Sequence, residues 1–100
     1  MNIRLVLQFD GTRYCGWQKQ KSHITVQSVA EKTLSKLLGH KVDVIGCSRT
    51  DAGVHALCYN ANFHTDTNIP PDKISYAVNP LLPEDIVVLE SCLVSDDFHA

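Results

Sequence analysis

The most chemically distinctive stretch of the sequence is GCSRTDAGVHA, residues 46–56, which places Arg49 and Asp51 two positions apart among small residues. A free aspartate is already ionised at neutral pH, so it needs no arginine to charge it in water. Burial changes this, because desolvation raises the pKa of a carboxylate by up to roughly 3–5 units. A guanidinium about 4 Å away contributes on the order of 4 kcal/mol near a protein surface and also fixes the orientation of the carboxylate. The pair therefore predicts a carboxylate that is covered yet charged, which suits a nucleophile.

The residues that follow the aspartate favour a turn with open space around the carboxylate. Gly53 permits backbone conformations that other residues resist and lets a ligand approach closely, and Ala52 adds little bulk. The alternative is an ordinary surface turn, since Asp and Gly are common between strands and exposed Arg–Asp pairs contribute little stability. The residue pattern alone leaves both interpretations open.

Hydrophobic periodicity predicts the elements that position this loop. Apolar residues alternate over residues 3–9, which indicates a half-buried strand, and recur at helical spacing from Val26 to Leu37. Thr25 is expected as the N-cap of that helix and Gly39 as its end. Three more strands are predicted, at residues 42–45, 57–64 and 86–94, and a second, short helix within residues 69–79. In the strand 57–64 the alternation places Leu57, Tyr59, Ala61 and Phe63 on the apolar face.

The resulting order, βαββαβ, is that of a ferredoxin-like α+β domain. Such a domain has a four-stranded antiparallel sheet with two helices on one face. The other face is then left for water, a ligand or a second domain. One hundred residues correspond to a single domain.

Composition narrows the protein class. The chain is 44% hydrophobic and has a net charge of −2, which is ordinary for a globular protein. Its apolar runs are too short for a membrane span or a signal peptide. We therefore expect a cytoplasmic protein without membrane association. Its four cysteines form no C-x-x-C pair, which favours free thiols and no metal site. Residues 1–50 carry eight Lys and Arg against three Asp and Glu, whereas residues 51–100 carry one against eight. This asymmetry fits either a phosphate-facing surface or chance.

Several longer motifs resemble the TruA family of tRNA pseudouridine synthases. The motifs are RTDAGVHA at 49–56, FDGTRYCGWQ at 9–18, VQS at 26–28, VNPLLPEDI at 78–86 and DFHA at 97–100. The resemblance implies the N-terminal half of the pseudouridine synthase fold, with residues 1–100 as the domain that carries the catalytic aspartate. It also implies an isomerase that converts uridine to pseudouridine at positions 38–40, in the anticodon stem-loop of tRNA, without a cofactor.

The resemblance assigns roles to particular residues. Asp51 is expected to be the nucleophile, attacking either the ribose C1′ or the uracil C6, with Arg49 as its ion-pair partner and with Thr50 and Gly53 in support. Two loops supply candidate contacts to RNA, independently of the resemblance. In the first, residues 10–24, basic and aromatic residues interleave, which favours Arg13, Lys19 and Lys21, with Arg13 and Lys19 as the main candidates, over the alternative that the lysines are only solvated. In the second loop His55 is a candidate. Tyr14 and Trp17, in the first of these loops, are expected to pack inside the protein rather than against RNA.

The sequence also departs from the family pattern. Ser48 stands where the family usually has Gly, which matters only if that position needs a positive φ, and Ser28 replaces a frequent acidic residue, which we expect to remove a capping box. Family members are more than twice as long, so the resemblance implies a second domain that is absent here and a homodimer for the full-length protein. We therefore expect residues 1–100 alone to be inactive.

Two other functions have the same general features. A non-catalytic RNA-recognition module shares the βαββαβ order, but it needs a basic-Gly-aromatic strand motif, and the third predicted strand, LCYNANFH, lacks it. A small dimeric aspartic protease has an Asp-x-Gly loop but needs Ser or Thr after the aspartate, where this chain has Ala52. The RNA-recognition module remains the main alternative.

Overall fold

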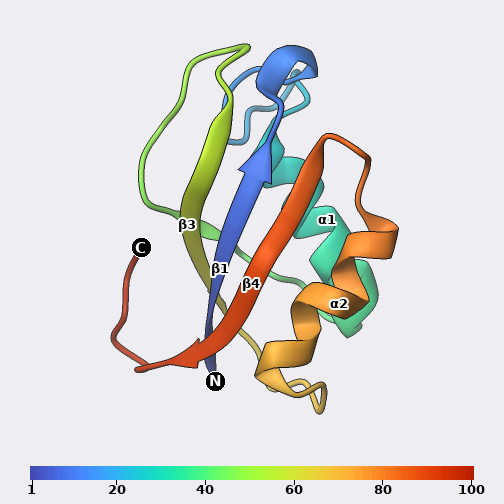
Figure 1. Ribbon diagram of the computed structural model, residues 1–100, viewed down its shortest axis with the longest axis vertical. Helices are drawn as coiled ribbons and strands as arrows, with labels where there is room; N and C mark the ends of the chain where they lie inside the picture. The colour runs from blue at the N-terminus through green and yellow to red at the C-terminus, as the bar shows by residue number, and fades with distance from the viewer.

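The computed structural model describes all 100 residues and confirms the predicted α+β, ferredoxin-like architecture (Figure 1). The four strands are β1 (Asn2–Phe9), β2 (Ile45–Gly46), β3 (Ala56–His64) and β4 (Ile86–Val94). They form one antiparallel sheet in the order β2-β3-β1-β4, so the first strand lies in the interior. The two α-helices, α1 (Val26–Leu38) and α2 (Ile74–Val78), lie on the same side of this sheet. None of the helices is long and apolar enough to cross a membrane.

The core lies between the sheet and the helices, where the predicted alternation of β1 places it. Ile3, Leu5, Leu7 and Phe9 are all buried, and together with residues of the helices and the other strands they form one cluster of 17 buried side chains. Tyr14 and Trp17 belong to the same cluster, which confirms that the aromatic residues of the first loop pack inside.

Helix α1 begins and ends where the sequence predicts, but its N-terminus differs in one respect. Thr25 is the N-cap, and Gly39 ends the helix with a φ of 75°. The expectation that Ser28 removes the capping box is wrong. The Ser28 hydroxyl accepts the Thr25 N–H at 3.1 Å, while the Thr25 hydroxyl accepts the Ser28 N–H at 3.2 Å. A serine at this position is long enough to complete both bonds of the box.

Strand β2 is shorter than the predicted 42–45, because helix side chains satisfy the backbone before it. Val42 and Val44 are buried. However, the N–H of Val42 donates to the Ser35 hydroxyl at 2.9 Å, and the N–H of Val44 donates to the Glu31 carboxylate at 2.8 Å. With its polar groups bonded to α1, this segment pairs with β3 only at Ile45 and Gly46.

The prediction that Leu57 faces the core is wrong, because β3 contains a β-bulge. The pairing of β1 with β3 shifts between Leu7, opposite Tyr59, and Phe9, opposite Ala56, so β3 carries one extra residue there. Alternation is therefore interrupted, and Leu57 is 78% exposed instead of lying beside Tyr59 in the core. β4 has its predicted bounds, and the second helical segment is α2 with a 3-10 turn on each side, Pro71–Lys73 and Asn79–Leu81.

Candidate active site

The candidate site is built from two loops at one end of the sheet. The first loop, residues 10–25, connects β1 to α1, and the RTD loop, residues 47–55, connects β2 to β3. Figure 1 shows the tip of the RTD loop beside the turn that follows β1. Their positions follow from the sheet order, because β1 and β3 are neighbouring antiparallel strands whose ends bring both loops together.

Glycines allow the two loops to pack backbone against backbone. A Cβ on Gly16 would lie 2.1 Å from the carbonyl oxygen of Thr50, and a Cβ on Gly11 would lie 1.9 Å from that of Val54. The N–H of Gly53, which has a φ of 80°, donates to the Tyr14 carbonyl at 3.1 Å. Only glycine fits so closely against another backbone at positions 11 and 16, so these two contacts, with the Gly53 hydrogen bond, fix where the RTD loop lies.

Within the RTD loop, Thr50 is turned inward while its neighbours are exposed. The Thr50 hydroxyl is buried and has no hydrogen-bond partner, whereas Arg49 and Asp51 are both exposed. Ser48 has no positive φ, so serine is not strained there.

Arg49 and Asp51 do not form an ion pair in this structure. The ion pairs of the chain involve other residues, and the Asp51 carboxylate is exposed instead of covered. An exposed pair gains only about 0–1 kcal/mol, too little to hold two mobile side chains together. The small residues Ala52 and Gly53 beside Asp51 provide no cover either.

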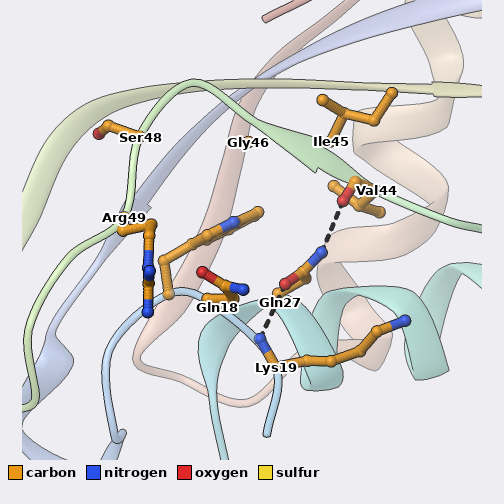
Figure 2. A pocket seen from close by; sticks show the side chains of 9 residues that line it. Gln18, Lys19, Gln27, Val44, Ile45, Gly46, Ser48 and Arg49 are labelled. Carbon is orange, nitrogen blue, oxygen red and sulfur yellow. Dashed lines mark hydrogen bonds between the residues drawn. The ribbon is translucent and has the colours of Figure 1, made fainter.

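Arg49 and Asp51 nevertheless line the same hollow. It has a volume of about 370 Å³, and its other lining residues include Gln18, Gln20 and His23 of the first loop. A second hollow of about 390 Å³ adjoins it and shares Gln18 and Arg49 (Figure 2). Arg49 therefore lies between the two hollows with its guanidinium free of any carboxylate.

Two side chains of α1 fix the wall of the second hollow. Gln27 donates to the carbonyl of Val44 at 2.8 Å and accepts the N–H of Lys19 at 2.8 Å, as the dashed lines of Figure 2 show. Glu31 accepts the N–H of Val44 and also the ammonium of Lys19, at 2.9 Å. The first loop and the segment before β2 are thus tied to one helix.

The four predicted RNA contacts fall into different environments. Arg13 and Lys19 are engaged within the protein, Arg13 with Asp85 at 2.7 Å and Lys19 with Glu31. The hydrogen bonds with these carboxylates raise the pKa of both basic groups. Lys21 is exposed and has no ion pair.

His55 contacts the first loop. Its Nδ1 accepts the N–H of Gly11 at 2.9 Å, a bond that requires the neutral ring with its proton on Nε2. The Asp10 carboxylate lies 3.1 Å from the same nitrogen. His55 therefore contacts two residues at the start of the first loop.

Sequence reasoning missed three polar residues that organise the site, namely Gln27, Glu31 and Asp85. Gln27 and Glu31 are four apart, and this spacing places them on one helix face beside the apolar stripe. Asp85 lies within the VNPLLPEDI motif, but nothing in the sequence links it to the first loop. Tyr59 was expected in the core, yet its hydroxyl also bonds Ser48 at the start of the RTD loop, and burial raises its pKa to about 12.

Comparison with known proteins identifies the family. Residues 5–100 match the family model described as tRNA pseudouridine synthase. The chain is 56% identical over 99 residues to a tRNA pseudouridine synthase A of Clostridium acetobutylicum and 59% identical over 98 residues to one of Ruminiclostridium cellulolyticum. These alignments cover 99% and 98% of this chain but 41% and 40% of the relatives, so the chain spans about two fifths of their length. The chain belongs to the tRNA pseudouridine synthase family.

Proposed function

We propose that this chain is the part of a tRNA pseudouridine synthase that supplies the catalytic aspartate, Asp51. The observation that carries the proposal is that Arg49 and Asp51 line one hollow, on a loop held in place by glycine contacts. The relatives named tRNA pseudouridine synthase A support uridine in tRNA as the substrate. The anticodon stem-loop, at positions 38–40, is the proposed location of that uridine.

The reaction is an isomerisation that requires no redox change. The N1–C1′ bond breaks, the uracil turns within the site, and C5 bonds to C1′, while the hydrogen of C5 leaves as a proton and N1 gains one. Asp51 acts as the nucleophile, toward C1′ of the ribose or C6 of the uracil. Both atoms are hidden in a stacked helix, so the nucleotide is first flipped out, at a cost of a few kcal/mol.

Arg49 is the group available to act with the aspartate. Its guanidinium has no carboxylate partner and lies between the two adjoining hollows. It can therefore approach Asp51 once substrate and further protein cover the hollow, because an ion pair strengthens as the water around it is removed. Thr50 and Gly53 support the loop, and Lys21 is the proposed basic RNA contact without an ion pair inside the protein.

The rest of the protein is part of this proposal. We expect the remaining length seen in the relatives to cover the hollow, a homodimer to form at full length, and the 100-residue chain alone to be inactive. The main alternative, a non-catalytic RNA-recognition module, is disfavoured because the strand aromatics Phe9, Tyr59 and Phe63 are all buried in the core rather than exposed for base stacking.

The test uses residues 1–100 joined to the remaining part of the Clostridium acetobutylicum relative. Turnover is followed as release of tritium from tRNA that carries [5-³H]uridine, since the C5 hydrogen leaves during the reaction. Asp51→Asn should lower turnover by about 10³-fold or more while tRNA affinity stays within roughly threefold. Asp66→Asn, at an exposed carboxylate far along the chain, is the matched control. Full turnover by Asp51→Asn would contradict the assignment, and turnover by the 100-residue chain alone would contradict the need for the other part.

A further inference from the structure

Asp85 is a largely buried carboxylate that uses both of its oxygens on the first loop. It lies just before β4, with a side chain only 12% exposed. One oxygen accepts two bonds from the Arg13 guanidinium, at 2.9 and 2.7 Å, and the other accepts the Tyr14 hydroxyl at 2.6 Å. The backbone carbonyl of Asp85 also accepts the N–H of Asp10 at 2.9 Å. Asp85 thus contacts three residues of one loop, Asp10, Arg13 and Tyr14, which is more than a surface ion pair provides.

The protonation states suit these contacts. Burial raises the pKa of the Asp85 carboxyl, but the hydrogen bonds from Tyr14 and Arg13 outweigh it, so the pKa lies below its usual value. Burial, and then the bond to Asp85, raise the pKa of the Tyr14 hydroxyl well above its usual range. Asp85 is therefore a charged acceptor and Tyr14 a protonated donor at neutral pH.

Tyr14 connects Asp85 to the RTD loop. The hydroxyl of Tyr14 is held by Asp85, and its backbone carbonyl accepts the N–H of Gly53, two residues after Asp51. The glycine contacts of the same loop, at Gly11 and Gly16, leave little space for the two backbones to slide. A displacement of Tyr14 is thus transmitted to the residues beside the Asp51 carboxylate.

We propose that Asp85 is a positioning residue of the reaction, which fixes the RTD loop through Tyr14 and Arg13 so that Asp51 faces the hollow. This inference rests on the proposed function, in which Asp51 is the nucleophile. It gives Arg13 a role inside the protein in place of the predicted contact with RNA, because the guanidinium is committed to Asp85. The substrate is not touched by Asp85, whose effect is on the geometry of the loop.

The test compares Asp85→Asn with Glu84→Gln in the joined polypeptide described above. Both changes remove one negative charge near Arg13, but Glu84 makes no side-chain hydrogen bond. Asp85→Asn should lower kcat by about 10- to 100-fold, the loss typical of a small misplacement of a reacting group, with KM and tRNA affinity unchanged. Hydrogen exchange at the Gly53 amide should become faster in Asp85→Asn and stay the same in Glu84→Gln.

Two outcomes would overturn the proposal. An unchanged kcat in Asp85→Asn is one, and a raised KM with unchanged kcat is the other, since that pattern indicates that Arg13 binds RNA. If Asp85→Asn does not fold, Tyr14→Phe decides, because it removes one hydrogen bond and keeps the buried ring: a lowered kcat supports the proposal and an unchanged kcat overturns it. Failure of the proposed function itself is distinguishable, because Asp51→Asn would then remain active.

Discussion

Replacement of Gly16 by alanine should destabilise the protein far more than the same replacement at Gly39. Both glycines have a positive φ, 81° and 75°, so either alanine is forced into the left-handed region. They differ in their surroundings. A Cβ at Gly16 would lie 2.1 Å from the carbonyl oxygen of Thr50, whereas a Cβ at Gly39 would have nothing within 4 Å.

The expected magnitudes follow from these two terms. The left-handed conformation costs an alanine about 1–2 kcal/mol, which is the whole expected loss for Gly39→Ala. At Gly16 the contact with Thr50 cannot be relieved by a side-chain rotation, because the neighbour is backbone, and such overpacking adds about 1–3 kcal/mol. Gly16→Ala should therefore lose about 2–5 kcal/mol, a large part of the roughly 5–15 kcal/mol typical of a domain.

Urea unfolding followed by tryptophan fluorescence measures both variants, since Trp17 is buried in the core beside the first loop. With an m-value of about 1–3 kcal/mol per molar urea, the midpoint for Gly16→Ala should lie roughly 1 M below that for Gly39→Ala. Equal midpoints would refute the argument, because they would mean that the RTD loop does not lie against Gly16. A loss of tRNA turnover in Gly16→Ala at temperatures where the variant is folded would show that the contact also positions Asp51.

Two further predictions test the helix cap and the buried carboxylate. Ser28→Ala should lower the free energy of unfolding by about 1 kcal/mol, because it removes one half of the capping box. Ser28→Glu should have the same free energy of unfolding as the unaltered protein. An unchanged free energy of unfolding in Ser28→Ala would contradict a role for the box. The folded-state pKa of Asp85 lies below its unfolded value, so its contribution to stability is complete above the ordinary carboxyl pKa and is lost as the pH falls through the lowered value. The difference in unfolding free energy between the unaltered protein and Asp85→Asn should therefore shrink as the pH falls below about 4, where Arg13 and Tyr14 stay protonated. A difference that grows in acid would contradict the lowered pKa of Asp85.

The fold could be predicted from the sequence wherever periodicity and capping agree. Alternation in β1 and β4 and the apolar stripe of α1 each specify one buried face, and Thr25 and Gly39 bound the helix. These are local signals, read within one element. The strand order then follows from the βαββαβ connections.

Where prediction failed, a contact between distant segments decided the structure. The residue at which β2 begins depends on Gln27 and Glu31, which lie more than ten residues earlier in the chain. Their side chains bond the backbone of Val44, which a neighbouring strand would otherwise do. The exposure of Leu57 depends on a bulge against β1. Neither can be read from the periodicity of the segment itself.

The sequence anticipates that Arg49 and Asp51 lie on one loop, but not that their side chains remain exposed and unpaired. The sequence indicates that Arg49 and Asp51 share a loop between strands, and both line one hollow. A covered ion pair, however, requires groups above the carboxylate, and residues two apart on an exposed loop cannot supply them. The carboxylate that is largely covered and paired with an arginine is Asp85, which bonds Arg13. The sequence had suggested this arrangement for Asp51 and Arg49.

The distribution of ion pairs changes which cations can meet a phosphate. Arg13 and Lys19 were the most attractive candidates in the sequence, but each would have to leave a carboxylate to bind RNA, so each gains less from the exchange. Arg49 and Lys21 have no such partner, and Arg49 already lines the hollow that contains Asp51. The logarithm of the tRNA affinity falls linearly with the logarithm of the salt concentration, with a slope proportional to the number of phosphates that the protein contacts. Replacing Arg49 or Lys21 by an uncharged residue should therefore make this slope shallower. The same replacement at Arg13 or Lys19 should leave the slope nearly unchanged. A reversed order would mean that the ion pairs of the protein open when tRNA binds.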